Sequence, residues 1–312
     1  MSVMRTVLLK ASENSWLRNR APRYRFIRRS VERFLPGEGL DDALAAAGRL
    51  AQLRIDTLLT HLGENVTDRT EAEAVTGHYS QALDRIRAAA LPSEISVKLT
   101  QLGLDLDNEF CYANLERLLR DSQESTPGRV VWIDMEHSPY VDVTLEMYRR
   151  ARKAFANAGV CVQAYLYRTE KDLDSLVPMG ATVRLVKGAY NEPSEIAYPK
   201  KSDVDENYFH LAQRLLSPEA RGAGVRAALA THDPKLIDRI RAWAASQGIP
   251  TNKIEFAMLY GIQRGEQERL AREGYRVSVL VSYGSFWFPW FMRRLAERPA
   301  NLFFLARNVL SA

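Results

Sequence analysis

Residues 130–166 are VVWIDMEHSPYVDVTLEMYRRARKAFANAGVCVQAYL, and this stretch contains the repeating unit from which the fold can be predicted. Val130–Met135 is a short run rich in β-branched and aromatic residues, which is typical of a buried strand. Val143–Asn157 has the spacing of an amphipathic helix, and Val160–Leu166 is a second β-prone run. A strand, a helix and another strand in this order predict a parallel βαβ unit.

The same alternation continues along the chain in both directions. The β-prone runs are Arg54–Leu59, Ile95–Leu99, Val130–Met135, Val160–Leu166, Thr182–Lys187, Arg226–Thr231, Ile254–Met258 and Arg276–Ser282. Eight parallel strands close a (β/α)₈ TIM-type barrel, and about 250 residues is the usual size of this fold. Because no Pro/Gly/Ser-rich linker divides the chain, we predict an α/β protein with a helical arm over residues 1–50 and one barrel domain over residues 51–312.

The composition and charge exclude several classes of protein. The chain has 312 residues, of which 46% are hydrophobic and 26% charged, and this excludes a disordered, collagen-like or coiled-coil protein. The net charge is +5, but the segment Arg18–Arg33 alone contributes +6 from seven Arg and one Glu. A charge confined to one segment argues against nucleic-acid binding by the whole domain. Isolated Cys111 and Cys161, and the lack of an apolar run of roughly 18–20 residues, favour a cytoplasmic protein.

Active sites of (β/α)₈ barrels lie at the carboxyl ends of the strands, so residues at those positions are candidates for chemistry. Polar or ionisable side chains stand at or just after nearly every predicted strand. They are Glu64, Lys98, Asp134, Glu136, His137, Gln163, Arg184, Lys187, Thr231, His232, Asp233 and Tyr260. Any one placement is explained by chance, but their recurrence around the barrel favours an enzyme.

The segment after the last predicted strand, residues 283–298, is YGSFWFPWFMRRLAER. One interpretation is an aromatic helix that packs on the barrel mouth while Arg293 and Arg294 reach water. The other is a C-terminal lid helix whose two guanidinium groups bind a carboxylate, with Lys98 as a third cation across the mouth. From the residues alone, the prediction is a barrel enzyme that acts on a small carboxylic acid.

Two other functions remain open on the residues alone. His61, His137 and His232 lie at or near strand ends and would suit a metal-dependent hydrolase on the same barrel, although no HxH or HExxH motif is present. A non-catalytic protein would instead bind anionic lipid or nucleic acid through Arg18–Arg33. The segment Gly222–Ala227 matches the letters of a dinucleotide fingerprint, but it precedes a predicted strand and opens no helix, so it lacks the geometry that holds a phosphate.

The candidate segments also resemble the proline dehydrogenase family, in its short monofunctional bacterial form. The matching blocks occur in order, one on each predicted strand or just after it, from about residue 50 to residue 300. They are LGENV (62–66), SVKLTQLGLD (96–105), IDME (133–136), QAYLYRTEKDL (163–173), VRLVKGAY (183–190), ATHD (230–233), EFAMLYG (255–261) and the helix with Arg293 and Arg294. Each block is weakly specific, but the ordered set is specific.

The resemblance implies a flavoenzyme that oxidises L-proline to Δ1-pyrroline-5-carboxylate by hydride transfer to FAD and passes the electrons to a quinone. This reaction is the first step of proline catabolism to glutamate. By residue-to-residue match, Lys98, Arg293 and Arg294 are implied to bind the proline carboxylate. Leu259 matches an apolar wall of the substrate pocket, and Glu64 matches a residue that pairs with Arg293 to gate the pocket.

The resemblance also assigns catalytic and cofactor-binding roles. Asp134 matches the active-site acid, and Arg184 matches the residue that tunes the flavin, where a cation stabilises the negative charge of the reduced ring. The positions that match FAD-lining residues of the family are Met135, Gln163, Arg184, Lys187, Gly188, Ala189, Thr231, His232 and Glu297. The sequence does not identify a group that accepts the proton of the substrate amine.

Two positions depart from the family pattern. Some relatives have Tyr where this chain has Leu280, so the resemblance leaves selectivity for proline over hydroxyproline undecided, and Ala257 stands where Gln is usual. The implied partners are a quinone and a downstream pyrroline-5-carboxylate dehydrogenase, with no nucleic acid. The Arg-rich segment 18–33 suggests a transient contact with the inner face of the cytoplasmic membrane.

Overall fold

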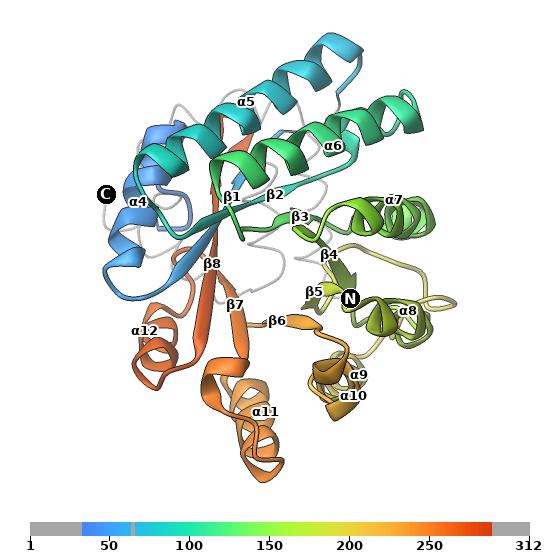
Figure 1. Ribbon diagram of the computed structural model, residues 1–312. Helices are drawn as coiled ribbons and strands as arrows, with labels where there is room; N and C mark the ends of the chain where they lie inside the picture. The colour runs from blue at the N-terminus through green and yellow to red at the C-terminus, as the bar shows by residue number, and fades with distance from the viewer. Residues whose placement is uncertain (1–32, 64–65, 289–312) are drawn as a thin grey trace, which may run out of the picture.

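Eight parallel strands form a closed barrel in the computed structural model, which describes residues 33–63 and 66–288 (Figure 1). The strands follow one another around the barrel in chain order, and β8 pairs with β1 to close it. They are β1 (Asp56–His61), β2 (Ser93–Val97), β3 (Val131–Ile133), β4 (Ala158–Gln163), β5 (Thr182–Val186), β6 (Arg226–Ala230), β7 (Glu255–Leu259) and β8 (Arg276–Tyr283). The predicted TIM-type barrel is confirmed.

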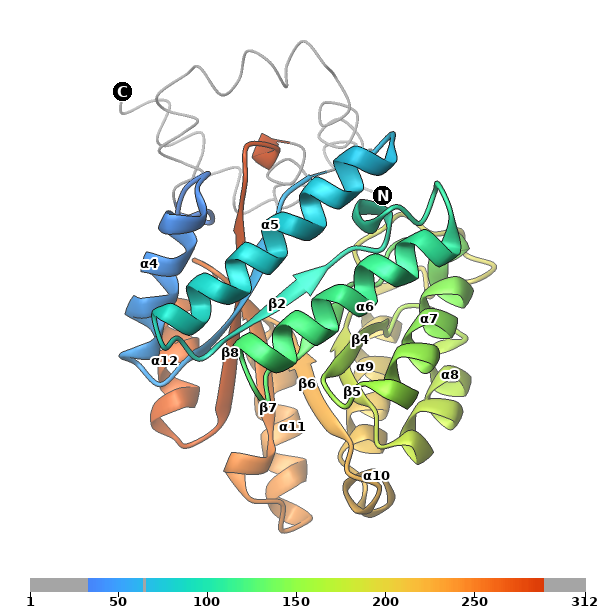
Figure 2. The same cartoon turned by 45° about the horizontal axis from the view of Figure 1, so that its top comes forward.

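Helices surround the barrel and connect its strands, as Figures 1 and 2 show from two directions. They are α4 (Leu40–Ala51), α5 (Arg69–Ala88), α6 (Asn108–Ser125), α7 (Val141–Ala154), α8 (Thr169–Leu176), α9 (Lys201–Leu215), α10 (Pro218–Gly222), α11 (Pro234–Ser246) and α12 (Arg264–Arg272). Short 3₁₀ turns are η2 (Thr100–Leu102), η3 (Ser138–Tyr140), η4 (Val177–Met179) and η5 (Thr251–Lys253). The first strand begins later than predicted because Arg54 has a left-handed backbone conformation, with φ of 59°, and ends a turn.

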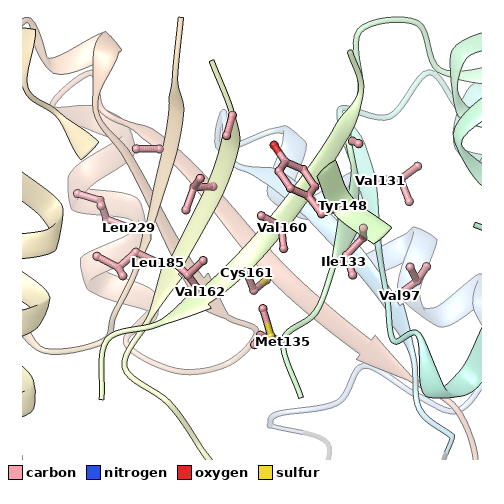
Figure 3. Close-up of a cluster of buried hydrophobic side chains, with 14 of the residues drawn as sticks. Val97, Val131, Ile133, Met135, Tyr148, Val160, Cys161, Val162, Leu185 and Leu229 are labelled. Atoms are coloured by element: carbon pink, nitrogen blue, oxygen red, sulfur yellow. The ribbon is translucent and has the colours of Figure 1, made fainter. Parts of the chain in front are cut away.

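The main hydrophobic core lies between the barrel wall and the helices (Figure 3). Successive side chains of a strand point to opposite faces, so alternate residues of the barrel strands face the helices. Val97, Val160, Leu185 and Leu229 are fully buried in this layer, together with Tyr148 of α7. Burying one such side chain contributes about 1.5–3 kcal/mol, so this layer holds the helices on the barrel.

Helix α4 packs against β1 and β8 and buries Ala43, Leu44, Ala46 and Ala47. The acidic first turn of this helix has a structural role, because Asp42 Oδ2 accepts a hydrogen bond from the backbone N–H of Gly39 at 3.1 Å. Helix α4 therefore shares the barrel's core. The division into an arm over residues 1–50 and a barrel over 51–312 stays a prediction, since residues 1–32 lie outside the described residues.

The inside of the barrel contains a charged network near the amino ends of the strands. Arg226 donates to both oxygens of Glu94, at 2.7 and 3.2 Å, and to both oxygens of Glu255, at 2.9 and 3.0 Å. Both carboxylates are buried, and the paired hydrogen bonds offset the cost of removing their charges from water. A small apolar cluster of Leu58, Val130, Trp132, Ala228 and Ala257 is also buried inside the barrel. Ala257, which stands where relatives usually have Gln, therefore lies in the packed interior of the barrel.

Gly159 on β4 leaves the space that this interior cluster needs, which gives a test of the packing. A Cβ at Gly159 would lie 2.7 Å from Val130 Cγ1 and 2.8 Å from Trp132 Cε3, whereas a Cβ at Gly77 on α5 would meet no atom within 4 Å. We expect Gly159→Ala to lower the free energy of unfolding by about 1–3 kcal/mol through overpacking. The matched variant Gly77→Ala should raise it by about 0.5–1 kcal/mol through helix propensity. If chemical denaturation gave the same change in the free energy of unfolding for Gly159→Ala and Gly77→Ala, the result would contradict this packing.

Candidate active site

A buried ion pair between Arg184 and Asp134 lies at the centre of the candidate site. Arg184 is on β5 and only 4% exposed, and Asp134 directly follows β3. The guanidinium Nη2 donates to Asp134 Oδ1 and, at 2.8 Å, to Ser96 Oγ, while Nε donates to Cys161 Sγ at 3.0 Å. Burial opposes the charge of Arg184, but Cys161 and Asp134 favour it, and the pKa of the guanidinium is raised. The structure therefore brings together the two residues predicted to be catalytic.

Ser96 and Cys161 are site residues that the sequence reasoning missed. Ser96 Oγ donates to Asp134 Oδ1 at 2.7 Å, so it bridges the acid and the arginine. Burial raises the pKa of the Cys161 thiol to about 12, which keeps its sulfur neutral beside the cation. Ser96 stands two residues before Lys98, and Cys161 two residues before Gln163. Because side chains alternate along a strand, this spacing was the available signal.

Two polar atoms of the site are buried without a partner among the described residues: Arg184 Nη1 and Gln163 Oε1. The Gln163 Nε2 atom donates to the carbonyl oxygens of Met135, at 3.4 Å, and Glu136, at 3.1 Å. These two bonds assign the orientation of the amide, so its oxygen faces the other way. A buried donor on β5 and a buried acceptor at the end of β4, both left open, are the features expected of a ligand site.

Lys98 follows β2 and provides a positive charge at the carboxyl end of the barrel. Its side chain makes no hydrogen bond or ion pair with the part of the chain that the structure describes. The nearby Glu136 accepts from the backbone N–H of Thr100 at 3.2 Å and from its hydroxyl at 2.8 Å. Burial raises the pKa of Glu136, and the charge of Lys98 and the Thr100 bonds oppose that rise. Lys98 is therefore available to bind an anion.

The loops after β5, β6 and β7 carry the next group of predicted residues. Lys187 pairs with Asp205 and, at 3.4 Å, with Asp233. His232 Nε2 accepts a hydrogen bond from the backbone N–H of Leu259 at 2.8 Å, so the neutral ring carries its proton on Nδ1. This bond connects a predicted cofactor residue to the predicted apolar wall of the substrate pocket.

Three more predicted cofactor residues are described, with different surroundings. Thr231 is buried after β6, and its hydroxyl accepts from the backbone N–H of Asp233 at 3.2 Å. Gly188 has φ of +113°, and a Cβ there would lie 2.3 Å from the ring of Tyr165, so both backbone and space require glycine. Ala189 is exposed. Four predicted site residues, Glu64, Arg293, Arg294 and Glu297, lie outside the described residues.

The three histidines of the metal hypothesis are not brought together as ligands. His61 packs against His78 and Tyr283, His137 packs against Tyr140 and Tyr190, and His232 is bonded to Leu259. Among the described residues, no three His, Cys, Asp or Glu side chains form a group suited to a metal ion.

The structure also has no helix, within those residues, that is long and apolar enough to cross a membrane.

The fold and the site define an enzyme class: a (β/α)₈ barrel with a buried Arg–Asp pair and a set of open polar groups at its carboxyl end. Residues 43–307 match the family model described as proline dehydrogenase. The chain therefore belongs to the proline dehydrogenase family. It is accordingly a flavin-dependent oxidoreductase that oxidises proline in proline catabolism.

Individual relatives agree with this assignment. Proline dehydrogenase 1 of Bacillus subtilis is 37% identical over 309 residues, which is 99% of each chain. The proline dehydrogenase of Deinococcus radiodurans is 36% identical over 285 residues, or 90% of each chain. The crystal structure of proline utilization A from Bdellovibrio bacteriovorus, inactivated by N-propargylglycine, matches with a TM-score of 0.79 and 25% identity. That match covers 87% of this chain and 33% of the larger protein. No comparison supports the metal-dependent hydrolase.

His61 at the end of β1 predicts a pH dependence of stability. Burial, and secondarily His78, lowers the pKa of His61 to about 4, against roughly 6.5 in an unfolded chain. The native state therefore resists protonation that the unfolded state accepts, and stability is lost as pH falls from about 6.5 toward 4. We expect His61→Asn to reduce the fall in melting temperature between pH 7 and pH 5. The melting temperatures are measured by circular dichroism. If the fall between pH 7 and pH 5 is the same in His61→Asn as in the wild type, the acid sensitivity comes from other groups.

Proposed function

We propose that this protein oxidises L-proline to Δ1-pyrroline-5-carboxylate with FAD as the hydride acceptor and a quinone as the final electron acceptor. The observation that carries this proposal is the buried Arg184, fixed by Asp134, Ser96 and Cys161, with its Nη1 group left open. A cation held rigidly in a water-poor site stabilises negative charge that develops during reaction, without a reorganisation cost.

The residues present fit a flavin. An isoalloxazine ring offers acceptors at N1, O2, O4 and N5 and one donor at N3–H, and the open atoms of the site are a donor, Arg184 Nη1, and an acceptor, Gln163 Oε1. The other candidates for lining FAD are Met135, Lys187, Gly188, Ala189, Thr231 and His232 among the described residues, and Glu297 outside them. When bound, FAD supplies the two-electron acceptor that no side chain provides.

The chain's own residues bind and orient the substrate. Lys98, Arg293 and Arg294 hold the proline carboxylate, since ammonium and guanidinium groups form charge-assisted hydrogen bonds with carboxylates. Fixing that end places the ring without a covalent bond, which lowers the entropic part of the barrier. Leu259 limits access of water on one side, and Glu64 with Arg293 gates the entrance. Asp134 acts by holding the Arg184 guanidinium in place.

Leu280 contributes to the choice of substrate. It lies on β8, is partly buried and packs against the apolar cluster inside the barrel. An aliphatic side chain here provides no hydroxyl to contact the substrate ring. The pocket therefore discriminates between proline and hydroxyproline less by polar contacts than a relative with tyrosine at this position.

The proposal includes the partners of the enzyme. A quinone would accept the electrons that bound FAD supplies, and a pyrroline-5-carboxylate dehydrogenase would consume the labile product. Segment 18–33, with its excess of arginine, would contact an anionic membrane surface, where a quinone is dissolved. Curated relatives of the bifunctional type, such as PutA of Escherichia coli, are longer than this chain, which covers 24% of that protein.

The absorption spectrum of the purified protein tests the cofactor and the reaction together. We expect the bands of a bound oxidised flavin in the visible region, which bleach under anaerobic conditions when L-proline is added. Addition of a soluble quinone should restore the bands. A colourless protein after expression with adequate riboflavin, or a flavin that proline does not bleach, would contradict the proposal.

Lys98→Met tests the carboxylate clamp, because methionine keeps the length of the side chain and removes its charge. A hydrogen bond to a charged group contributes about 1.5–3 kcal/mol, so we expect KM for proline to rise by about 10–100-fold. The value of kcat should change less, since the contact exists both before and during reaction. Lys253→Met, in η5 just before β7 at the opposite end of the barrel, is the matched control. Equal steady-state constants for wild type and Lys98→Met would remove Lys98 from the clamp.

A further inference from the structure

Trp132 lies inside the barrel, close to two guanidinium groups. The Cζ atom of Arg184 is 5.2 Å from the centroid of its ring, and the Cζ atom of Arg226 is 5.3 Å from it. Trp132 is fully buried on β3, two residues before Asp134. Cations within about 6 Å of an indole centroid are attracted to its electron-rich face, and most strongly where water is absent. The ring therefore contacts the candidate active-site arginine from within the barrel.

Glu94 of β2 holds the same indole from its edge. Trp132 Nε1 donates to Glu94 Oε2 at 2.6 Å, and Glu94 also accepts from Arg226 and from the backbone N–H of Val130. A hydrogen bond from an indole N–H to a carboxylate is charge-assisted and short. It fixes the rotation of the ring and increases the electron density of its face. Both effects strengthen the contact with Arg184.

We propose that Trp132, oriented and polarised by Glu94, is a positioning residue that holds Arg184 in the geometry that stabilises the reduced flavin. This inference rests on the proposed function. The hydrogen bonds of Arg184 fix its Nε and Nη2 atoms, and the face of the indole lies 5.2 Å from its Cζ atom. With the guanidinium held in this way, the Nη1 group, which has no partner among the described residues, would keep a fixed position for a bound cofactor.

Glu255 makes a matched control possible. It is buried like Glu94 and binds the same Arg226 through two oxygens. Its other polar contacts within the described part of the chain are with Arg276 and Ser278, and it makes no hydrogen bond with Trp132. Glu94→Gln and Glu255→Gln thus remove the same charge from the same arginine. They differ in whether the indole loses its carboxylate partner.

The test measures the midpoint potential of the bound flavin, together with the melting temperature, in the holoenzyme and its variants. We expect Glu94→Gln and Trp132→Phe to weaken stabilisation of the reduced flavin about tenfold, a fall of about 30 mV for a two-electron couple. Glu255→Gln should change the stabilisation of the reduced flavin by less than about threefold relative to wild type, so its midpoint potential should stay close to the wild-type value. It should lower the melting temperature as much as Glu94→Gln does. The sign is informative, because simple loss of a negative charge near the flavin would raise the potential.

Each result decides the inference. A lower potential in Glu94→Gln and Trp132→Phe, with Glu255→Gln unchanged, supports the role of Trp132. An unchanged or raised potential in Glu94→Gln overturns it, and so does an equal fall in Glu255→Gln. If Trp132→Phe does not fold, the pair of glutamine variants still decides the question.

Failure of the wild-type flavin to be bleached by proline would refute the proposed function itself. A wild type that is bleached normally, with variants whose potential is unchanged, would refute only the role of Trp132.

Discussion

A positive charge buried inside the barrel is the constraint on which the site depends. The Arg184 guanidinium is removed from water, and an uncompensated charge in that position would cost several kcal/mol. The fold meets this constraint with an acid, a hydroxyl, a thiol and an aromatic ring, supplied by strands β2, β3 and β4 around β5. Because those groups are themselves fixed by the barrel, the arginine is held ready without having to move.

The same logic extends from the site to the amino end of the barrel. Arg226, Glu94 and Glu255 form a second compensated cluster, and Trp132 lies between it and Arg184. The interior of this barrel therefore contains two charged clusters and a buried indole beside its apolar cluster of Leu58, Val130, Ala228 and Ala257. Buried charges of this kind are stable only when each keeps its partner, so we expect these two clusters to tolerate single substitutions poorly.

Much of the fold could be predicted from the chain because the signals are local. Alternating short apolar runs and amphipathic stretches indicated parallel βαβ units, and the position of active sites in such barrels pointed to Lys98, Asp134, Gln163 and Arg184. The partners Ser96 and Cys161 could not be predicted in the same way. Each lies on another strand from Arg184, and β2 is not a neighbour of β5. Cys161 meets Arg184 because it is its register partner on the neighbouring strand β4, and Ser96 meets it only because the sheet closes on itself.

Sequence and tertiary structure thus determined different properties of this protein. The periodicity and strand-end residues of the chain determine the eight-stranded barrel and the family, since both depend on patterns within short segments. The tertiary structure decides which side chains meet. Pairing of β6 with β7 brings His232 to Leu259, and packing inside the closed barrel gives Arg184 its acid and its indole. The same packing leaves Arg184 Nη1 and Gln163 Oε1 without a partner among the described residues. Contacts across the barrel depend on the stagger and tilt of all eight strands, and no local pattern encodes these.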